Sequence, residues 1–408
     1  MNQLKLLNFH KMIANFANNL VGAFVPLIVY QTTGNLMYAM IYLVSQYVLR
    51  LVFELSLKKL YGKYPQLLLL LRIVPITLYN VGIFILDVNL IVGIVIVCVF
   101  CALDNALNGL PKEIIFNYSS LSEKNGSDKS LGMTRLFEQI GIIIALVVGG
   151  FLLDVNKTLV LIISLTIYAI SVIPLVVFYI NSKNQKTFNK DATSNAINTL
   201  SKNEEFKKKS NKLTFKMLLC YGITYFTFAF YDIISSSYSL FVFIQKGEFA
   251  LAGILNAVFN SMYALGFFVA GIANDKKDLT KLVSIFSVLI GILALSLPFV
   301  NMDKYFIIVC LIYGTLGFTY PFISLFVLDR MLIKSRIMGV SNKALYVREI
   351  SCSTAYCIGY SAGFFGLIGI FISVFIFMCL SGFVIPYCEE KTRQNLVNYL
   401  QNNEIIRK

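Results

Sequence analysis

The chain has 408 residues, of which 57% are hydrophobic and only 14% are charged, and its mean hydropathy is +0.74. This composition excludes an ordinary soluble domain, because the apolar residues gather in runs of about 20, the length that crosses a bilayer as a helix. The formal net charge of +14 would suit nucleic acid, but most Lys and Arg residues lie in short segments between the apolar runs, which indicates membrane topology. We therefore predict a polytopic protein of the lipid bilayer that binds no nucleic acid.

Twelve apolar runs follow one another along the chain. They lack the alternation of barrel strands, so they predict an all-α polytopic membrane protein with 12 transmembrane helices in two six-helix bundles related by a pseudo-two-fold axis. The first six predicted spans are 11–31, 36–57, 65–86, 89–110, 135–153 and 158–180. The second six are 214–240, 248–271, 280–300, 304–328, 343–363 and 366–387.

A polar segment rich in Asn, Ser and Lys separates the two sets of spans. It cannot bury enough apolar surface to fold alone, so we interpret it as a flexible, basic cytoplasmic linker. The predicted domains are an N-terminal bundle at 1–180, the linker at 181–212, a C-terminal bundle at 213–388 and a cytoplasmic tail at 389–408.

Basic residues are distributed unequally between the two sides of the predicted helices. With the N-terminus in the cytoplasm, the outer loops contain only Lys157, Lys246 and Lys304, and nearly all other Lys and Arg residues face inward. This asymmetry predicts a multi-pass protein of the plasma membrane with both termini in the cytoplasm. The N-terminal apolar run has no small-residue cleavage site, so we expect a resident helix in place of a signal peptide.

Several kinds of chemistry are disfavoured by what the chain contains. His10 is the only histidine, and the eight cysteines fall in or at the ends of apolar runs, which weighs against a catalytic triad or a zinc site. No segment fits the phosphate-binding pattern G-x-x-x-x-G-K-[ST]. We therefore expect no enzyme activity, cofactor or metal.

Ionisable residues inside the first-half spans cost about 2.5–3.5 kcal/mol each on insertion scales, so each needs a reason. Arg50, Arg72 and Asp104 are predicted at similar depth, and Glu54 lies one helical turn from Arg50. We predict one ion network that links spans 2, 3 and 4. It either clamps the helices together near an inner gate, or presents Asp104 to protons or substrate.

Two later spans carry polar and aromatic stripes at helical spacing. The stripe of span 7 contains Tyr221, Tyr225, Phe228, Asp232, Ser235 and Ser239. The stripe of span 11 contains Tyr346, Glu349, Ser353, Tyr356 and Tyr360, with Arg348 beside it. Such stripes either join helices by hydrogen bonds or line a cavity, and Asp232, Glu349 and Asp104 are the candidates for proton coupling.

The architecture resembles the major facilitator superfamily of secondary transporters. Its loop signature (Gly, three residues, Asp, then basic residues) is matched by Gly271, Asp275, Lys276 and Lys277, and the first half keeps the basic character without the Asp. The fifth span, with Gly141, Gly149 and Gly150, resembles the Gly-rich fifth helix of exporters in this superfamily but lacks its proline. The resemblance implies that spans 1, 4, 7 and 10 line a central cavity and places near it the residues Asn15, Asn19, Asp104, Asn108, Asp232 and Tyr313.

These features predict a monomeric secondary transporter that exports a small amphipathic solute in exchange for protons. The alternatives are a solute uptake symporter and a flippase for a lipid or lipid-linked molecule, both of the same fold. A membrane-embedded enzyme and a transporter-derived sensor are further alternatives, which the histidine content and the intramembrane carboxylates disfavour respectively.

Overall fold

A computed structural model describes residues 3–61, 63–121, 127–183, 204–274, 279–338 and 340–402. Within these ranges every regular element is helical. The N-terminal half contains α1 (Gln3–Asn19), η1 (Gly22–Phe24), α2 (Val25–Thr33), α3 (Leu36–Tyr61), α4 (Pro65–Leu71), α5 (Ile73–Ile85), α6 (Leu90–Leu121), α7 (Ser127–Val155) and α8 (Lys157–Lys183). The C-terminal half contains α10 (Glu204–Phe228), η3 (Ala229–Asp232), α11 (Ile233–Lys246), α12 (Phe249–Asn274), α13 (Thr280–Ser296), η4 (Leu297–Phe299), α14 (Met302–Ile337), α15 (Ser341–Ser361), η5 (Ala362–Phe365) and α16 (Leu367–Asn402).

These helices confirm the predicted all-α polytopic membrane fold. Among the described residues, 11 helical segments are long and apolar enough to cross a membrane. The remaining predicted span, span 11, corresponds to α15, a helix of 21 residues. Because α15 carries Lys343, Arg348 and Glu349, it is more polar than the other spans. Its charged side chains therefore depend on partners in the protein interior.

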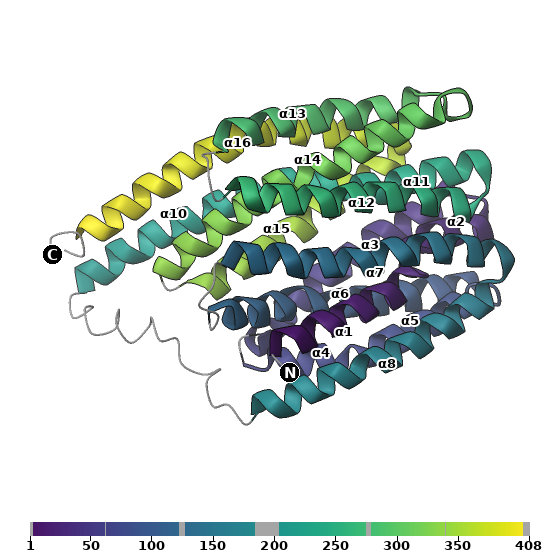
Figure 1. Cartoon of the computed structure of the whole chain (residues 1–408), viewed down its shortest axis with the longest axis horizontal. Helices are drawn as coiled ribbons and strands as arrows, with labels where there is room; N and C mark the ends of the chain where they lie inside the picture. The colour runs from purple at the N-terminus through teal and green to yellow at the C-terminus, as the bar shows by residue number, and fades with distance from the viewer. Residues whose placement is uncertain are drawn as a thin grey trace.

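Figure 1 shows the two halves lying side by side, with the axes of the helices roughly aligned. In the N-terminal half α1 packs on α7 and α8, and α6 packs on α3 and α5. In the C-terminal half α12 packs on α14, α13 on α16, and α10 on α15 and α16. Two long contacts join the halves: α7 packs on α12, and α3 packs on α15.

We name the two ends of the bundle by their chain segments. The terminal end is the one where α8 ends at Lys183 and α10 begins at Glu204. The loop end is the opposite one, where α2 ends at Thr33 and α11 ends at Lys246. Gly34 and Gly247 follow those two helices with positive φ angles of 63° and 74°, a backbone conformation that glycine adopts without a steric penalty.

Three spans are broken near their middle, and two of the breaks have a clear cause. Span 1 passes through η1 before α2, whose second residue is Pro26, a residue that cannot donate a backbone hydrogen bond. Span 3 breaks at Arg72 between α4 and α5, because Pro75 cannot donate to the carbonyl of Leu71 one turn earlier. Span 7 passes through η3 between α10 and α11.

The helices extend beyond the predicted domain boundaries. Much of the predicted linker at 181–212 lies outside the described residues, but α8 continues to Lys183 and α10 begins at Glu204, inside it. At the other boundary α16 runs without interruption to Asn402, so the start of the predicted tail at 389–408 is helical.

Glycines bring α7 close to a neighbour on each side. A Cβ at Gly141 would lie 2.4 Å from the carbonyl oxygen of Met12 in α1. Toward the other half, a Cβ at Gly253 of α12 would lie 2.4 Å from the carbonyl oxygen of Leu146 in α7. The α7–α12 contact is therefore made backbone to backbone, as small residues permit between membrane helices.

Candidate functional site

A cavity of about 350 Å³ lies among the helices of the N-terminal half. The breaks of spans 1 and 3 border it, through Gly22 and Arg72, and Ser236 of α11 reaches it from the other half. Its lining is mostly polar, and side-chain amides are the commonest group: Asn15, Asn18, Asn19, Gln46, Asn80, Asn105 and Asn108. Three tyrosines also line it: Tyr42, Tyr47 and Tyr79.

Arg72 and Asp104 form a two-point ion pair in the cavity wall. Arg72 Nε donates to Asp104 Oδ1 at 2.8 Å, and Arg72 Nη2 donates to Oδ2 at 3.1 Å. The Arg72 guanidinium also lies 5.9 Å from the ring centroid of Tyr168, on α8. Both members of the pair belong to the N-terminal half, so the pair neutralises the charge of Asp104 and fixes α6 against the break of span 3.

Several of the lining amides have hydrogen-bonding capacity left over. Asn80 is only 2% exposed, and its Oδ1 has no hydrogen-bond partner, while its Nδ2 donates to the carbonyl of Ile76 at 2.8 Å. Among the described residues the side chains of Asn15, Asn18 and Asn108 also make no hydrogen bond with the protein. A buried polar atom without a partner is costly, which applies to Asn80 Oδ1, whereas the half-buried side chains of Asn15, Asn18 and Asn108 are free to bond to a molecule in the cavity.

Asp232 lies at the break of span 7, at the end of η3. Tyr356 Oη of α15 donates to Asp232 Oδ2 at 2.5 Å, and within the described part of the chain Asp232 makes no ion pair. One helical turn further along, Ser236 lines the cavity and accepts a hydrogen bond from Tyr360 Oη at 3.0 Å. Asp232 is thus a carboxylate one helical turn from the cavity lining, held by a tyrosine and, among the described residues, by no cation.

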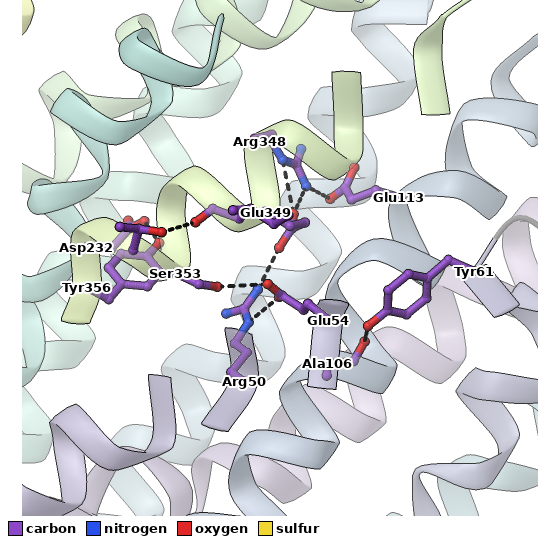
Figure 2. A network of polar contacts seen from close by, with 12 residues as sticks. Arg50, Glu54, Tyr61, Ala106, Glu113, Asp232, Arg348, Glu349, Ser353 and Tyr356 are labelled. Atoms are coloured by element: carbon purple, nitrogen blue, oxygen red, sulfur yellow. Dashed lines mark hydrogen bonds and ion pairs between the residues drawn. The ribbon is translucent and has the colours of Figure 1, made fainter. Parts of the chain in front are cut away.

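A second cluster of charges joins the two halves on the terminal side of the cavity (Figure 2). Arg50 of α3 donates from Nε to Glu54 Oε1 at 2.7 Å and from Nη2 to Glu349 Oε2 of α15 at 2.6 Å. Ser353 Oγ of α15 donates to Glu54 Oε2 at 3.2 Å. Each guanidinium and carboxylate here is largely buried, so every ion depends on the others for compensation.

The cluster continues through Arg348, which is paired with Glu349 and lies 3.8 Å from Glu113 of α6. A Cβ at Gly109, on the same helix as Glu113, would lie 3.0 Å from Glu349 Oε2, so this glycine makes room for the carboxylate. Arg348 also lies 6.0 Å from the ring centroid of Tyr225. We call Arg50, Glu54, Glu113, Arg348, Glu349 and Ser353 the inter-half cluster.

At the loop end the halves meet through aromatic rings. Tyr30 of α2 and Phe243 of α11 contact edge to face, with ring centroids 6.4 Å apart. Phe249, at the start of α12, lies 6.1 Å from Phe24 and 4.5 Å from Phe243, centroid to centroid. The cavity therefore lies between a charged contact on one side and an aromatic contact on the other.

The expected pair of Arg50 with Glu54 is present, but the prediction of one ion network through spans 2, 3 and 4 is wrong, because the charges form two separate groups. Arg72 and Asp104 pair with each other across spans 3 and 4, whereas Arg50 also pairs with Glu349 of span 11, and Ser353 of span 11 donates to Glu54. Similar depth along separate helices does not reveal which side of each helix a residue occupies, and the partner of Arg50 is 299 positions away in sequence.

The other candidates take varied positions. Asn15, Asn19, Asp104 and Asn108 line the cavity, whereas Tyr313 is fully buried in the C-terminal half, where its Oη bonds to Ser235 and Asn256. Tyr221 donates to the carbonyl of Arg330 at 3.2 Å, near the terminal end. A Cβ at Gly271 would have no atom of the described residues within 4 Å, and Asp275 and Lys276 lie outside those residues.

Some residues of the site were not foreseen from the sequence. Glu113 follows Pro111 near the end of span 4, and Gln46 and Asn80 are single polar residues in apolar runs. An isolated amide in a span is a weak signal, since such residues often only join helices. Pro75, close to Arg72 in span 3, is a signal in the sequence that could have pointed to this region.

Two halves of membrane-spanning helices, with a polar cavity lined by the N-terminal half and by Ser236 of the other half, match the architecture of a secondary transporter. The family model of the Major Facilitator Superfamily matches residues 118–347, more than half of the chain. The chain belongs to this superfamily, whose members are transporters and not enzymes. No curated protein matches it in sequence.

Solved transporters share the fold at low sequence identity. A bacterial homologue of the iron transporter ferroportin, outward-facing, has a TM-score of 0.62 and 13% identity and covers 97% of this chain and 100% of its own. The same homologue in its inward-facing state scores 0.63 at 12% identity, covering 95% and 98%. The nucleoside transporter NupG scores 0.61 at 11% identity, covering 96% and 99%. FucP, the fucose:proton symporter of E. coli, has a TM-score of 0.58 and 16% identity in its outward conformation and covers 95% of this chain and 98% of its own.

Proposed function

We propose that this transporter works as a monomer in the plasma membrane, with both termini in the cytoplasm, and exports a small solute in exchange for protons. The observation that carries proton coupling is the position of Asp232. Its carboxylate is hydrogen-bonded to Tyr356 and sits one turn from the cavity residue Ser236. A carboxylate inside a membrane protein without a cationic partner can take up and release a proton as its exposure to water changes.

The inter-half cluster and the aromatic contact at the loop end allow the cavity to open to one side of the membrane at a time. In one state the inter-half cluster closes the terminal side of the cavity, and opening that side separates Arg50 from Glu349. In the other state the aromatic contact of Tyr30 with Phe243 parts at the loop end. Rocking of one half against the other around a fixed central site couples these events.

The direction of transport rests on the glycines of α7. Gly141 and Gly149 place α7 against the backbone of α1, consistent with the Gly-rich fifth helix of exporters that the sequence resembles. Uptake together with protons is the second candidate, because the fold is similar to that of FucP, a fucose:proton symporter. A cavity of about 350 Å³ favours a small solute over a lipid, which weighs against a flippase.

Reconstituted proteoliposomes with a trapped pH dye test the proposal. A solute that the wild-type protein carries should drive proton movement. Asp232→Asn should reduce the rate of this proton movement at least tenfold relative to wild type. Asp87→Asn is the matched control, since Asp87 is exposed at the loop end and should leave flux unchanged. Proton flux in Asp232→Asn equal to that of wild type would overturn the assignment of Asp232, and the sign of the solute gradient that forms under an imposed pH gradient decides between export and uptake.

A further inference from the structure

The side chains that line the cavity indicate which chemical groups the solute carries. Seven side-chain amides line it, together with Ser164 and Ser236. An amide presents both a donor and an acceptor, which matches a hydroxyl group, since a hydroxyl also donates and accepts. A carboxylate or an ammonium group would use only one of these two functions.

The charge of the lining is balanced within the wall itself. Arg72 and Asp104 are the charged residues that line the cavity, and they satisfy each other through two hydrogen bonds. Among the residues that line the cavity, a charged solute would therefore find no free counter-charge, and burying an unpaired ion is expensive. The lining favours a solute with no net charge.

Some of the lining amides have donors or acceptors that the described protein does not use. Asn80 is nine-tenths buried or more, lines the cavity and leaves Oδ1 without a partner. Asn15 and Asn108 face the same space from α1 and α6 with no hydrogen bond to the described protein. Three helices therefore direct polar groups at one volume.

The volume sets the size of the solute. About 350 Å³ is at the small end of ligand cavities, which span roughly 300–1,000 Å³. At about 30 Å³ for each water molecule in the liquid, it holds on the order of ten waters, or a solute of about a dozen non-hydrogen atoms. The rings of Tyr42, Tyr47 and Tyr79 offer flat apolar faces on which the carbon face of a saturated ring can lie.

We propose that the cavity binds a neutral polyhydroxylated solute the size of a monosaccharide, held by the amides of Asn15, Asn19, Gln46, Asn80, Asn105 and Asn108. This inference rests on the proposed function, because it names the class of the transported solute. Asp232 is then the proton site beside the solute site, and Arg72–Asp104 is a fixed part of the wall.

Equilibrium binding of tritium-labelled hexoses, hexosamines and hexuronates to the purified protein, without any gradient, tests the charge preference on one ring skeleton. At least one neutral hexose should bind at least tenfold more tightly than its hexosamine and hexuronate. Labelled nucleosides in the same panel should bind more weakly, because they exceed the estimated volume. Tighter binding of the hexosamine or the hexuronate would overturn the proposal. So would the absence of binding of every neutral hexose, in a protein whose cooperative thermal unfolding shows that it is folded.

Two variants of one residue place the site in the cavity. Asn108→Leu should weaken hexose binding about tenfold, the effect of losing one or two hydrogen bonds. Asn108→Asp should weaken it similarly and improve hexosamine binding, because it adds a carboxylate without a counter-charge. Asn89→Asp is the control at the loop end, where Asn89 Oδ1 accepts from Val92 N and an Asp can do the same; hexose binding unchanged in both Asn108 variants would contradict the site.

The binding readout separates this inference from proton coupling. Hexose binding that persists in a protein with no solute-driven proton flux would leave the solute class standing and remove the coupling. Proton flux driven only by charged solutes would leave the proton coupling standing and remove the neutral solute class.

Discussion

The two long contacts between the halves are built from different chemistry. Between α7 and α12 the backbones meet, and the sites of closest approach are glycines such as Gly150 and Gly253. Between α3 and α15 the contact is made by ion pairs such as Arg50–Glu349 and by the stacked rings of Tyr47 and Tyr360, 5.6 Å apart and inclined by 11°. One contact depends on shape and the other on particular partners.

This difference assigns the contacts different roles in motion. Apart from the two hydrogen bonds that Asp154 of α7 accepts from the start of α12, this backbone contact through small residues can slide or roll without losing a hydrogen bond, so we infer that α7–α12 keeps the halves together in every state. An ion pair is either made or broken, so the α3–α15 contact contributes free energy to the closed state alone. The following substitutions test this assignment.

Glu349→Gln should have the largest effect. Removing the carboxylate leaves Arg50 with Glu54 alone and Arg348 with the more distant Glu113, and breaking a buried ion pair costs about 3–5 kcal/mol. The cost falls on the state that is closed at the terminal end, so that end should open. Pulsed electron resonance between spin labels at Lys59→Cys and Lys343→Cys, with the native cysteines replaced, should report a longer distance.

Glu138→Gln is the matched control for that experiment. Glu138 is equally buried and pairs with Lys11 at 3.1 Å, but both residues belong to the N-terminal half. It should lower stability without changing the distance between the labels. A shift of the same size in both variants would mean that the inter-half cluster has no special role in closure.

Gly253→Val should destabilise the protein by about 1–3 kcal/mol through overpacking. The added Cβ would meet the carbonyl oxygen of Leu146, which belongs to a helix backbone and cannot turn aside. Gly271→Val, on the same helix, should be close to neutral, because a Cβ there contacts nothing. Thermal unfolding in detergent measures both, and equal midpoints would contradict the backbone contact.

Asp154→Ala should have a smaller effect, of about 1–2 kcal/mol, typical for loss of a helix cap. Asp154 of α7 accepts from the backbone nitrogens of Phe249 at 3.0 Å and Ala250 at 2.9 Å, so it caps α12 across the two halves. Asp87→Ala, which removes a partly exposed pair with Lys157, should cost less than about 1 kcal/mol. Chemical unfolding that ranks them in the opposite order would count against the cap.

The fold could be predicted from the sequence because hydrocarbon imposes length and polarity on each span separately. Span 11 was predicted as one of the twelve apolar runs, although three charged residues make α15 less apolar than its neighbours. The break at η3 could not be foreseen, since no Pro or Gly lies at Ala229–Asp232.

The site was only partly predictable for a related reason. The polar residues Asn15, Asn19, Asp104 and Asn108 could be assigned to the cavity because the resemblance fixes which spans surround it. The pairings could not, because Arg50 had carboxylates available on several spans, and the choice of Glu349 depends on how the two halves dock. Pairing is a property of the tertiary structure, and sequence spacing records only the pairs within one helix, such as Arg50–Glu54.

The helix ends at Gly34 and Gly247 have a further consequence. In each half the glycine N–H bonds to the carbonyl of the residue four positions earlier, Tyr30 in one and Phe243 in the other, and these two residues contact each other. Equivalent residues that meet in this way form an isologous contact, as at the two-fold axis of a homodimer. This point of the single chain therefore behaves as a fused dimer interface, where one substitution alters only one partner and its mirror change must be made separately to restore a matched pair.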